Sequence, residues 1–158
     1  MINPCLDIPL VRFKKLHEKA RLPEYAHGEE DAGMDLFFLG VVDLDNQNLL
    51  PLILFPESQR RILGTTCVAS TGLAIELPPG HEGQVRSRSG LAAKHGVIVL
   101  NAPGTIDPGY RGELKVILQN TGNKAHTIMP GDKIAQLVIA PVTHAKIEEV
   151  SDLSDSAR

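Results

Sequence analysis

Three side chains of complementary chemistry lie within ten residues of one another, at Asn101, Asp107 and Tyr110. An asparagine amide presents a donor beside an acceptor, which suits the amide edge of a nucleobase. A carboxylate takes a proton, and an aromatic ring offers a flat face on which a sugar packs. The segment therefore predicts base recognition, proton transfer and sugar packing at one place. The alternative is an ordinary turn, because Asp-Pro-Gly-Tyr alone forms turns more often than sites.

A β-hairpin is the element expected to position these residues. Apolar runs flank the segment on both sides, and a Pro-Gly dipeptide at 108–109 lies between them. Proline presets φ at one turn position, and glycine permits a positive φ at the next. If the turn centres on this dipeptide, Asn101 falls opposite Val116 and Ala102 falls opposite Lys115.

A second candidate site precedes the one segment that is typical of a helix. Residues 86–90 are Arg-Ser-Arg-Ser-Gly, and the sequence predicts a short helix over 90–95, with Ser89 as its cap and Gly96 as its end. A helix N-terminus suits phosphate, and Arg88 adds a charged bidentate donor. The alternative is a plain capped helix with solvated arginines.

Two further motifs could face a site or serve the fold. Asp31 and Asp35 are four residues apart with Gly33 between them, and such acids could lie near a hard cation through water. The alternative is a loop that enters a strand. Gln136 lies in a strongly apolar predicted strand, where its amide needs a partner if buried or else faces a site. Both interpretations stay open.

Composition excludes several classes of protein. With 158 residues and a formal net charge of -3, the chain is expected to form one domain and lacks the basic excess of a general nucleic-acid or membrane-surface binder. Cys5 and Cys67 match neither a zinc spacing nor a disulfide framework, and the scattered histidines suggest no metal cluster. No leader or membrane-spanning run is visible, so we expect a cytoplasmic protein.

Short apolar runs separated by glycine and proline predict an all-β protein, as a sandwich, jelly roll or small barrel. The predicted strands are 9–13, 34–39, 50–55, 72–77, 82–88, 97–101, 114–120 and 135–142.

Four of these segments together resemble the homotrimeric dUTP pyrophosphatases (dUTPases). The resemblance spans about residues 22–150, with the motifs in the family's order and spacing. It implies a distorted jelly-roll β-barrel with one short helix, assembled as a trimer with shared active sites. The matching motifs are 32–36 (Ala-Gly-Met-Asp-Leu), 88–92 (Arg-Ser-Gly-Leu-Ala), 101–113, and 131–137 (Gly-Asp-Lys-Ile-Ala-Gln-Leu).

The resemblance also implies roles for individual residues. Asp107 would activate the water that attacks the α-phosphorus, and Tyr110 would pack on deoxyribose and exclude a 2′-hydroxyl. Asn101 would bind uracil together with hairpin backbone near Lys115, and Asp35 would orient water on a Mg²⁺ ion held by the phosphates. The other implied substrate contacts are Arg88, Ser89, Gly90 and Gln136 on the triphosphate, and Thr105 and Ile106 along the hairpin wall.

The implied activity is that of a dUTP diphosphatase. It hydrolyses dUTP to dUMP and pyrophosphate with Mg²⁺, which limits uracil in DNA and supplies dUMP for dTMP synthesis. One alternative is a module that senses dUTP with weak turnover. Another is dCTP deaminase, which shares the fold but has a glutamate on the strand after the Asp hairpin, where residues 114–118 contain no acid.

Two departures from the family pattern concern the domain boundaries. We expect residues 1–150 to form a single dUTPase-like domain in which 41–70 are longer than the family pattern, with no function assigned to that excursion. Residues 151–158 would form a C-terminal arm, with Arg158 resembling the first residue of the family's glycine-rich fifth motif. Because that motif closes over the nucleotide, full activity of this chain would require it.

Overall fold

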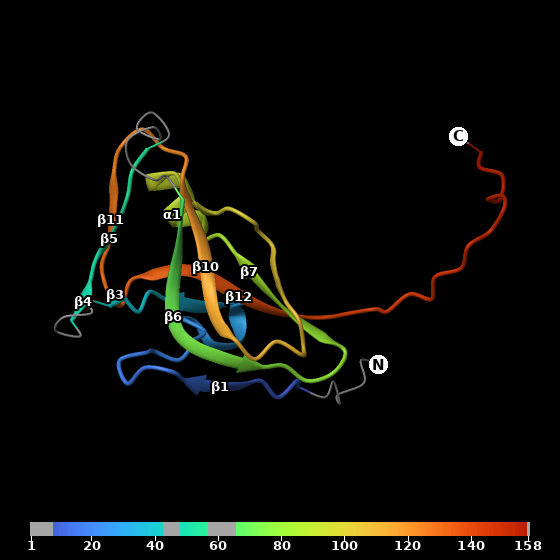
Figure 1. Ribbon diagram of the computed structural model, residues 1–158, viewed down its shortest axis with the longest axis horizontal. Helices are drawn as coiled ribbons and strands as arrows, with labels where there is room; N and C mark the ends of the chain where they lie inside the picture. Colours follow the sequence, from blue (N-terminus) through green and yellow to red (C-terminus); the bar gives the residue numbers. More distant parts are fainter. Residues whose placement is uncertain (1–7, 43–47, 57–65, 158) are drawn as a thin grey trace.

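The computed structural model describes residues 8–42, 48–56 and 66–157, which contain twelve strands, one short α-helix and a 3-10 helix, η1, at Gly28–Glu30. Most of the strands belong to two four-stranded antiparallel sheets (Figure 1). The all-β prediction is therefore confirmed, and the arrangement fits the jelly-roll expectation. The first sheet has the order β1-β6-β10-β8, with β1 Arg12–Lys15, β6 Thr66–Glu76, β10 Glu113–Asn120 and β8 Val97–Val99.

The second sheet joins strands that are far apart in the sequence. Its order is β2-β12-β7-β9, so its two edges are formed by β2 and β9. Two small ribbons complete the described strands, β3–β4 and β11–β5. The bounds are β2 Met34–Phe37, β12 Lys133–Pro141, β7 His81–Arg86, β9 Gly104–Ile106, β3 Val41–Val42, β4 Leu49–Leu50, β11 His126–Ile128 and β5 Leu52–Leu54.

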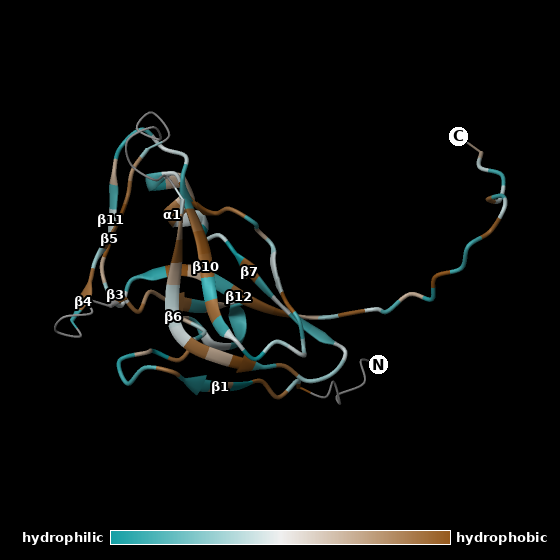
Figure 2. Cartoon of the chain, viewed as in Figure 1, coloured by the Kyte–Doolittle hydropathy of each residue, from teal (hydrophilic) through white to brown (hydrophobic). Residues whose placement is uncertain are grey.

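The hydrophobic core is built from both four-stranded sheets. In β10, Leu114, Val116 and Leu118 are fully buried and alternate with positions that are partly buried or exposed, as the two-residue period of a strand requires. They join buried side chains such as Leu36 of β2 and Leu137 of β12 in one cluster. Figure 2 shows hydrophobic segments recurring along β6, β10 and β12, whereas the edge strand β1 is largely hydrophilic.

A bulge in β6 interrupts its ladder with β10. Glu113 pairs with Ala74 and Lys115 pairs with Ser70, so three residues of β6 face Leu114 alone. Gly72, at the centre of the bulge, has φ +69, which L side chains rarely adopt. The bulge lies opposite Leu114, directly after the segment 107–113, and the Gly72 N–H donates to the Glu113 side chain there.

The predicted helix is present, but its cap is one residue earlier than expected. Helix α1 runs Ser89–His95, and Arg88 occupies the N-cap position without a side-chain cap, so the prediction that Ser89 caps the helix is wrong. Gly96 ends the helix as predicted, with φ +68. A Cβ at this position would come 2.5 Å from the backbone nitrogen of Gly122, so glycine is required here.

The strand predictions hold for all the long strands and miss some of the short ones. Each of the eight predicted strands overlaps an observed strand, but the strands at 41–42, 104–106 and 126–128 were not predicted. These strands are only two or three residues long, and the partners of the last two are distant in the sequence. Within the excursion 41–70 the structure contains β3, β4, β5 and the start of β6, whereas 43–47 and 57–65, including Asp43 and Asp45, lie outside the described residues.

The C-terminal segment leaves the sheets after β12. The backbone nitrogen of Val142 donates to the carbonyl of Gly80 at 2.8 Å. From 143 to 157 the chain has no helix or strand and runs away from the sheets (Figure 1). Among the described helices, none is both long enough and apolar enough to cross a bilayer.

Candidate active site

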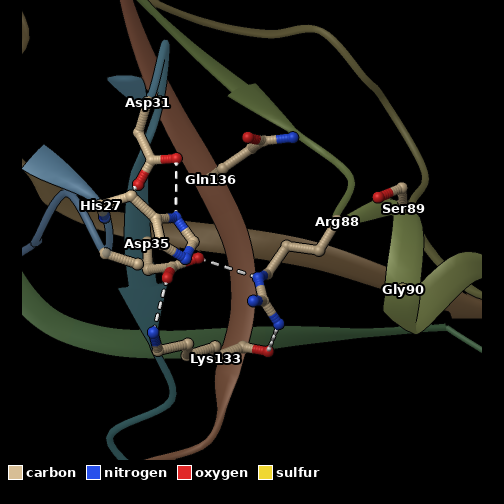
Figure 3. Close-up of a pocket in the computed structure, with 10 residues that line it drawn as sticks. His27, Asp31, Asp35, Arg88, Ser89, Gly90, Lys133 and Gln136 are labelled. Carbon is tan, nitrogen blue, oxygen red and sulfur yellow. Dashed lines mark hydrogen bonds and ion pairs between the residues drawn. The ribbon is translucent and has the colours of Figure 1, made fainter. Parts of the chain in front are cut away.

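A polar cleft of about 340 Å³ opens between β2, β12 and the start of α1. It brings together side chains from three of the four sequence motifs (Figure 3). The sequence-predicted residues in it are Asp31, Asp35, Arg88, Ser89, Gly90 and Gln136, and Ala26, His27, Gly33 and Lys133 complete its lining.

Asp35 lies at the centre of the cleft, between two cations. Its carboxylate accepts a hydrogen bond from Arg88 Nε at 2.9 Å and pairs with Lys133 Nζ at 2.7 Å (Figure 3). Asp35 is 8% exposed, and a carboxylate this buried requires such partners. The hydrogen bond to Asp35 raises the pKa of Lys133, so the ammonium stays charged. One carboxylate is thus flanked by two fixed positive charges.

Four side chains that could contact an anionic ligand line the cleft together, those of Arg88, Lys133, Ser89 and Gln136. Arg88 and Lys133 are each about one third exposed, so both reach solvent beyond Asp35. Ser89 and Gly90 begin α1 and are exposed beside them. Lys133 also lies 3.6 Å from Glu24, and Asp31 lines the same cleft, so the two cations are balanced by nearby carboxylates. Arg88 is the cation best suited to an anionic ligand here, because its planar guanidinium matches phosphate oxygens.

The Gln136 amide both has a hydrogen-bond partner within the fold and faces the cleft, so the two interpretations of its sequence context are compatible. Its Nε2 donates to the carbonyl of Ser87 at 2.9 Å, and its side chain also lines the cleft. Gly33 packs directly against it, since a Cβ at Gly33 would lie 2.9 Å from Gln136 Oε1. The glycine between the two motif acids therefore makes room for the amide.

The carboxylates of the cleft fit a hydrated divalent cation better than a direct protein chelate. The backbone N–H of His27 lowers the pKa of Asp31, and the His27 ring at 3.1 Å lowers it further. In the described part of the chain, no group of three or more His, Cys, Asp or Glu could hold a metal ion. Mg²⁺ commonly keeps several waters and binds one or two carboxylates plus substrate phosphates. This donor set is compatible with that mode.

The second group of predicted site residues lies around the segment 101–115. Asp107 directly follows β9, is exposed, and its carbonyl accepts the Tyr110 N–H at 3.0 Å to close the turn. Tyr110 is 40% exposed. Asn101 lies against Gly104, where a Cβ would come 3.1 Å from Asn101 Nδ2. Thr105 and Ile106 belong to β9, and Lys115 is exposed on β10, 3.4 Å from Glu113.

The hairpin prediction is right in register and wrong in extent. Val99 pairs with Leu118, the register that would place Asn101 opposite Val116. The ladder ends at Val99, however, and Asn101 and Ala102 are outside it. The next strand, β9, leaves this sheet and pairs with β7 instead. The segment therefore bridges the two sheets.

The two groups of site residues lie near opposite edges of the second sheet. Asp35 is on edge strand β2, and the pairing through β12 aligns it with Arg86 of β7. Asp107 comes directly after the other edge strand, β9, whose last residue, Ile106, pairs with Gly83 of β7. Three strand spacings sideways and four residues along the strands separate Asp35 from Asp107 by roughly 19 Å. A general base must lie within about 3 Å of its proton or act through one water. One chain therefore does not bring Asp107 to a phosphate held in its own cleft.

Sequence reasoning missed two titratable side chains of the cleft, those of Lys133 and His27, as well as Ala26. Lys133 was part of the fourth motif, but its contact with Asp35 depends on the pairing of β12 with β2. The sequence feature that could have indicated Lys133 is its position directly after a turn, at the start of the strand that contains Gln136. His27 forms its contact with Asp31 four residues away, and a local pattern could have identified that pair.

A stacked histidine pair links α1 to the ribbon β11–β5. The rings of His95 and His126 have centroids 4.1 Å apart. Burial lowers the pKa of His126 below the ordinary 6.5, the nearby His95 lowers it further, and Asp132 opposes the shift.

We expect this pair to reduce stability in mild acid. His126 binds a proton more readily in the unfolded chain, so the free energy of unfolding falls as the pH drops below 6.5 and levels off below the folded-state pKa. Urea denaturation between about pH 5 and 8 measures the profile. H126Q should flatten it in this window. An unchanged slope in H126Q would assign the pH dependence to other groups.

Most of the chain is similar to known proteins. The dUTPase family model matches residues 18–158. The chain is 45% identical over 148 residues to the deoxyuridine 5′-triphosphate nucleotidohydrolase of Crocosphaera subtropica, covering 94% of this chain and 92% of that relative. It is 48% identical over 148 residues to the protein of that name from Clostridium tetani, covering 94% and 90%. A solved structure of a mutant dUTPase from phage phi11 of S. aureus, described with a structural Mg(II) ion, is similar with TM-score 0.75 and 26% identity, covering 92% of this chain and 99% of that one.

Proposed function

Because this chain belongs to the dUTPase family, we propose that it hydrolyses dUTP to dUMP and pyrophosphate. The observation that supports this most directly is the cleft in which Asp35 is flanked by Arg88 and Lys133, next to Ser89. Phosphoryl transfer needs little beyond positioning and charge neutralisation, and these groups supply both for a triphosphate. The cleft alone does not identify the nucleotide, and the family assignment identifies it as dUTP.

Each part of the reaction has a residue in the proposed mechanism. Arg88 binds phosphate oxygens with its guanidinium, and the Ser89 hydroxyl and the free N–H of Gln136 complete the contacts. Asp107 accepts the proton of the water that attacks the α-phosphorus. Tyr110 packs on deoxyribose and Asn101 binds uracil, with Lys115 beside it. Gly90 leaves space at the cleft, and Thr105 and Ile106 form the wall beside the base.

We infer that Mg²⁺ takes part and that Asp35 orients its water ligands rather than binding it directly. When bound, the ion neutralises charge on the triphosphate oxygens. Asp35 accepts hydrogen bonds on both carboxylate oxygens, from Arg88 and Lys133, which supports an indirect contact. Arg88 and Lys133 in turn hold the carboxylate in a fixed orientation.

The separation of the two groups supports a homotrimer with shared sites. A nucleotide whose phosphates lie in the cleft of one protomer would meet Asp107 and Tyr110 of a neighbouring protomer. The site would then be complete only between copies of the chain, because roughly 19 Å separates its halves within one copy. We place this enzyme in the cytoplasm, with neither nucleic acid nor membrane as a partner.

A substrate panel tests the proposed activity. Incubation with dUTP, UTP, dCTP and dTTP, followed by product identification, should give dUMP and pyrophosphate from dUTP. UTP should react far more slowly, because its 2′-hydroxyl would press against the Tyr110 ring without a hydrogen-bond partner. Deamination of dCTP would instead support the deaminase alternative. Binding of dUTP without products would support a sensing module.

A further inference from the structure

The Tyr110 ring is held in place before any substrate arrives. Its hydroxyl donates to the backbone carbonyl of Glu113 at 2.7 Å. The ring also lies directly over Gly112, where a Cβ would come 2.7 Å from Tyr110 Oη and 2.8 Å from Cζ. The absence of a side chain at Gly112 therefore permits the ring position, and the Glu113 carbonyl fixes its far end.

Glu113 is itself attached to the bulge in β6. Its Oε1 accepts the backbone N–H of Gly72 at 2.9 Å, and its Oε2 lies 3.4 Å from Lys115 Nζ. The Glu113 side chain is only 21% exposed. Thr71, also in the bulge, donates from its buried hydroxyl to the carbonyl of Leu114 at 2.6 Å. Two side-chain hydrogen bonds thus tie residues 113 and 114 to the bulge.

These contacts form a continuous chain from the sheet to the sugar-binding ring. The bulge fixes the Glu113 side chain, and Glu113 presents the carbonyl that receives the Tyr110 hydroxyl. Gly72 N–H lies within the bulge, at a point where the ladder between β6 and β10 is interrupted. The Glu113 carboxylate therefore accepts a hydrogen bond from a backbone N–H that has no partner in the interrupted ladder.

We propose that Glu113 is a positioning residue for substrate selection, which acts by holding Tyr110 against the deoxyribose. The inference rests on the proposed function, since it assigns Tyr110 to the sugar. Glu113 touches neither substrate nor reacting atoms in this scheme. Its role is to keep the ring where a 2′-hydroxyl would collide with it.

Comparison of E113A with E113Q separates the bulge contact from the ion pair. Both variants lose the charge that pairs with Lys115, but only glutamine keeps an oxygen that accepts the Gly72 N–H. The measurement is the ratio of kcat/KM for dUTP to kcat/KM for UTP. Loss of one hydrogen bond should lower this ratio about three- to tenfold in E113A. E113Q should keep a ratio close to that of the unmodified protein.

The ratio is insensitive to a general loss of folded protein. Both substrates are tested on the same preparation, so an inactive fraction reduces both values equally. G112A supplies an independent variant, because its methyl group would displace the Tyr110 ring while leaving Glu113 in place. It should lower the ratio as E113A does.

A double-mutant cycle with Y110F completes the test. Phenylalanine removes the hydroxyl that bonds to Glu113, so E113A should change the ratio little further in a Y110F background. An unchanged ratio in E113A, an equal loss in E113Q, or full additivity with Y110F would each overturn the proposal. Absence of dUTP hydrolysis in the unmodified protein would instead overturn the proposed function, so the two failures are distinguishable.

Discussion

Replacement of Asp107 by asparagine should lower kcat for dUTP by about 10²–10⁴-fold, the usual contribution of a general base. Asparagine has nearly the same shape but cannot take a proton at neutral pH. Among the described residues, the Asp107 carboxylate has no hydrogen bond or ion pair, and only its backbone carbonyl contributes to the turn. The fold should therefore tolerate the change, and affinity for dUTP should be largely retained.

Steady-state kinetics, calorimetric binding of dUTP and thermal unfolding measure these three effects separately. Glu18→Gln is a matched control, since it neutralises an exposed carboxylate in the loop after β1. It should leave kcat unchanged. Near-normal turnover in D107N would remove Asp107 from the role of general base. A large loss of binding or stability would assign it a structural role instead.

Two inactive variants should restore activity when their subunits are mixed. R88A damages the cleft and D107N damages the turn after β9, and in the proposed trimer each active site takes these residues from different protomers. In a random one-to-one mixture, about one quarter of the sites would combine an intact Arg88 with an intact Asp107. Each variant alone should be nearly inactive, and the random mixture should reach about one quarter of the activity of the unmodified protein. Trimers purified to contain both kinds of subunit should reach about one third, because one of their three sites is then intact.

The structure indicates that both variants can fold. Asp35 keeps its contact with Lys133 when Arg88 is removed, so the carboxylate is not left without a partner. Subunits with two different affinity tags, refolded together and purified by both, would provide the mixed trimers. Mixing D107N with the R88A/D107N double variant is the control, because no site then contains an intact Asp107. If verified mixed trimers stay inactive, the two residues do not belong to sites shared between protomers.

The features that were predicted correctly from the sequence are those that depend on residues close together in the chain. The end of α1 at Gly96 follows from a steric demand for glycine, and it was predicted correctly. The register between β8 and β10 was also predicted, from the Pro-Gly turn. The cap at Arg88 was missed by one residue, because a serine side chain beside the helix start does not have to accept a backbone N–H.

Features that depend on the pairing of strands far apart in the sequence could not be predicted from local signals. Strand β9 was missed because its partner β7 precedes it by some twenty residues, and three residues give little periodicity. The types of the site residues could be inferred, but their division between two sheet edges follows only from the order β2-β12-β7-β9. The contact of Lys133 with Asp35 likewise requires β12 to lie beside β2.

The placement of Asp35 and Asp107 near opposite edges of one sheet has a consequence for inheritance. If each site is built from the cleft of one protomer and the turn of another, mutations in this single gene fall into two complementation groups. A cell with one allele altered at Arg88 and another at Asp107 would retain dUTP hydrolysis. Two alleles altered at the same edge would not complement each other. In such a trimer, the sheet order would determine which pairs of defective alleles a cell tolerates.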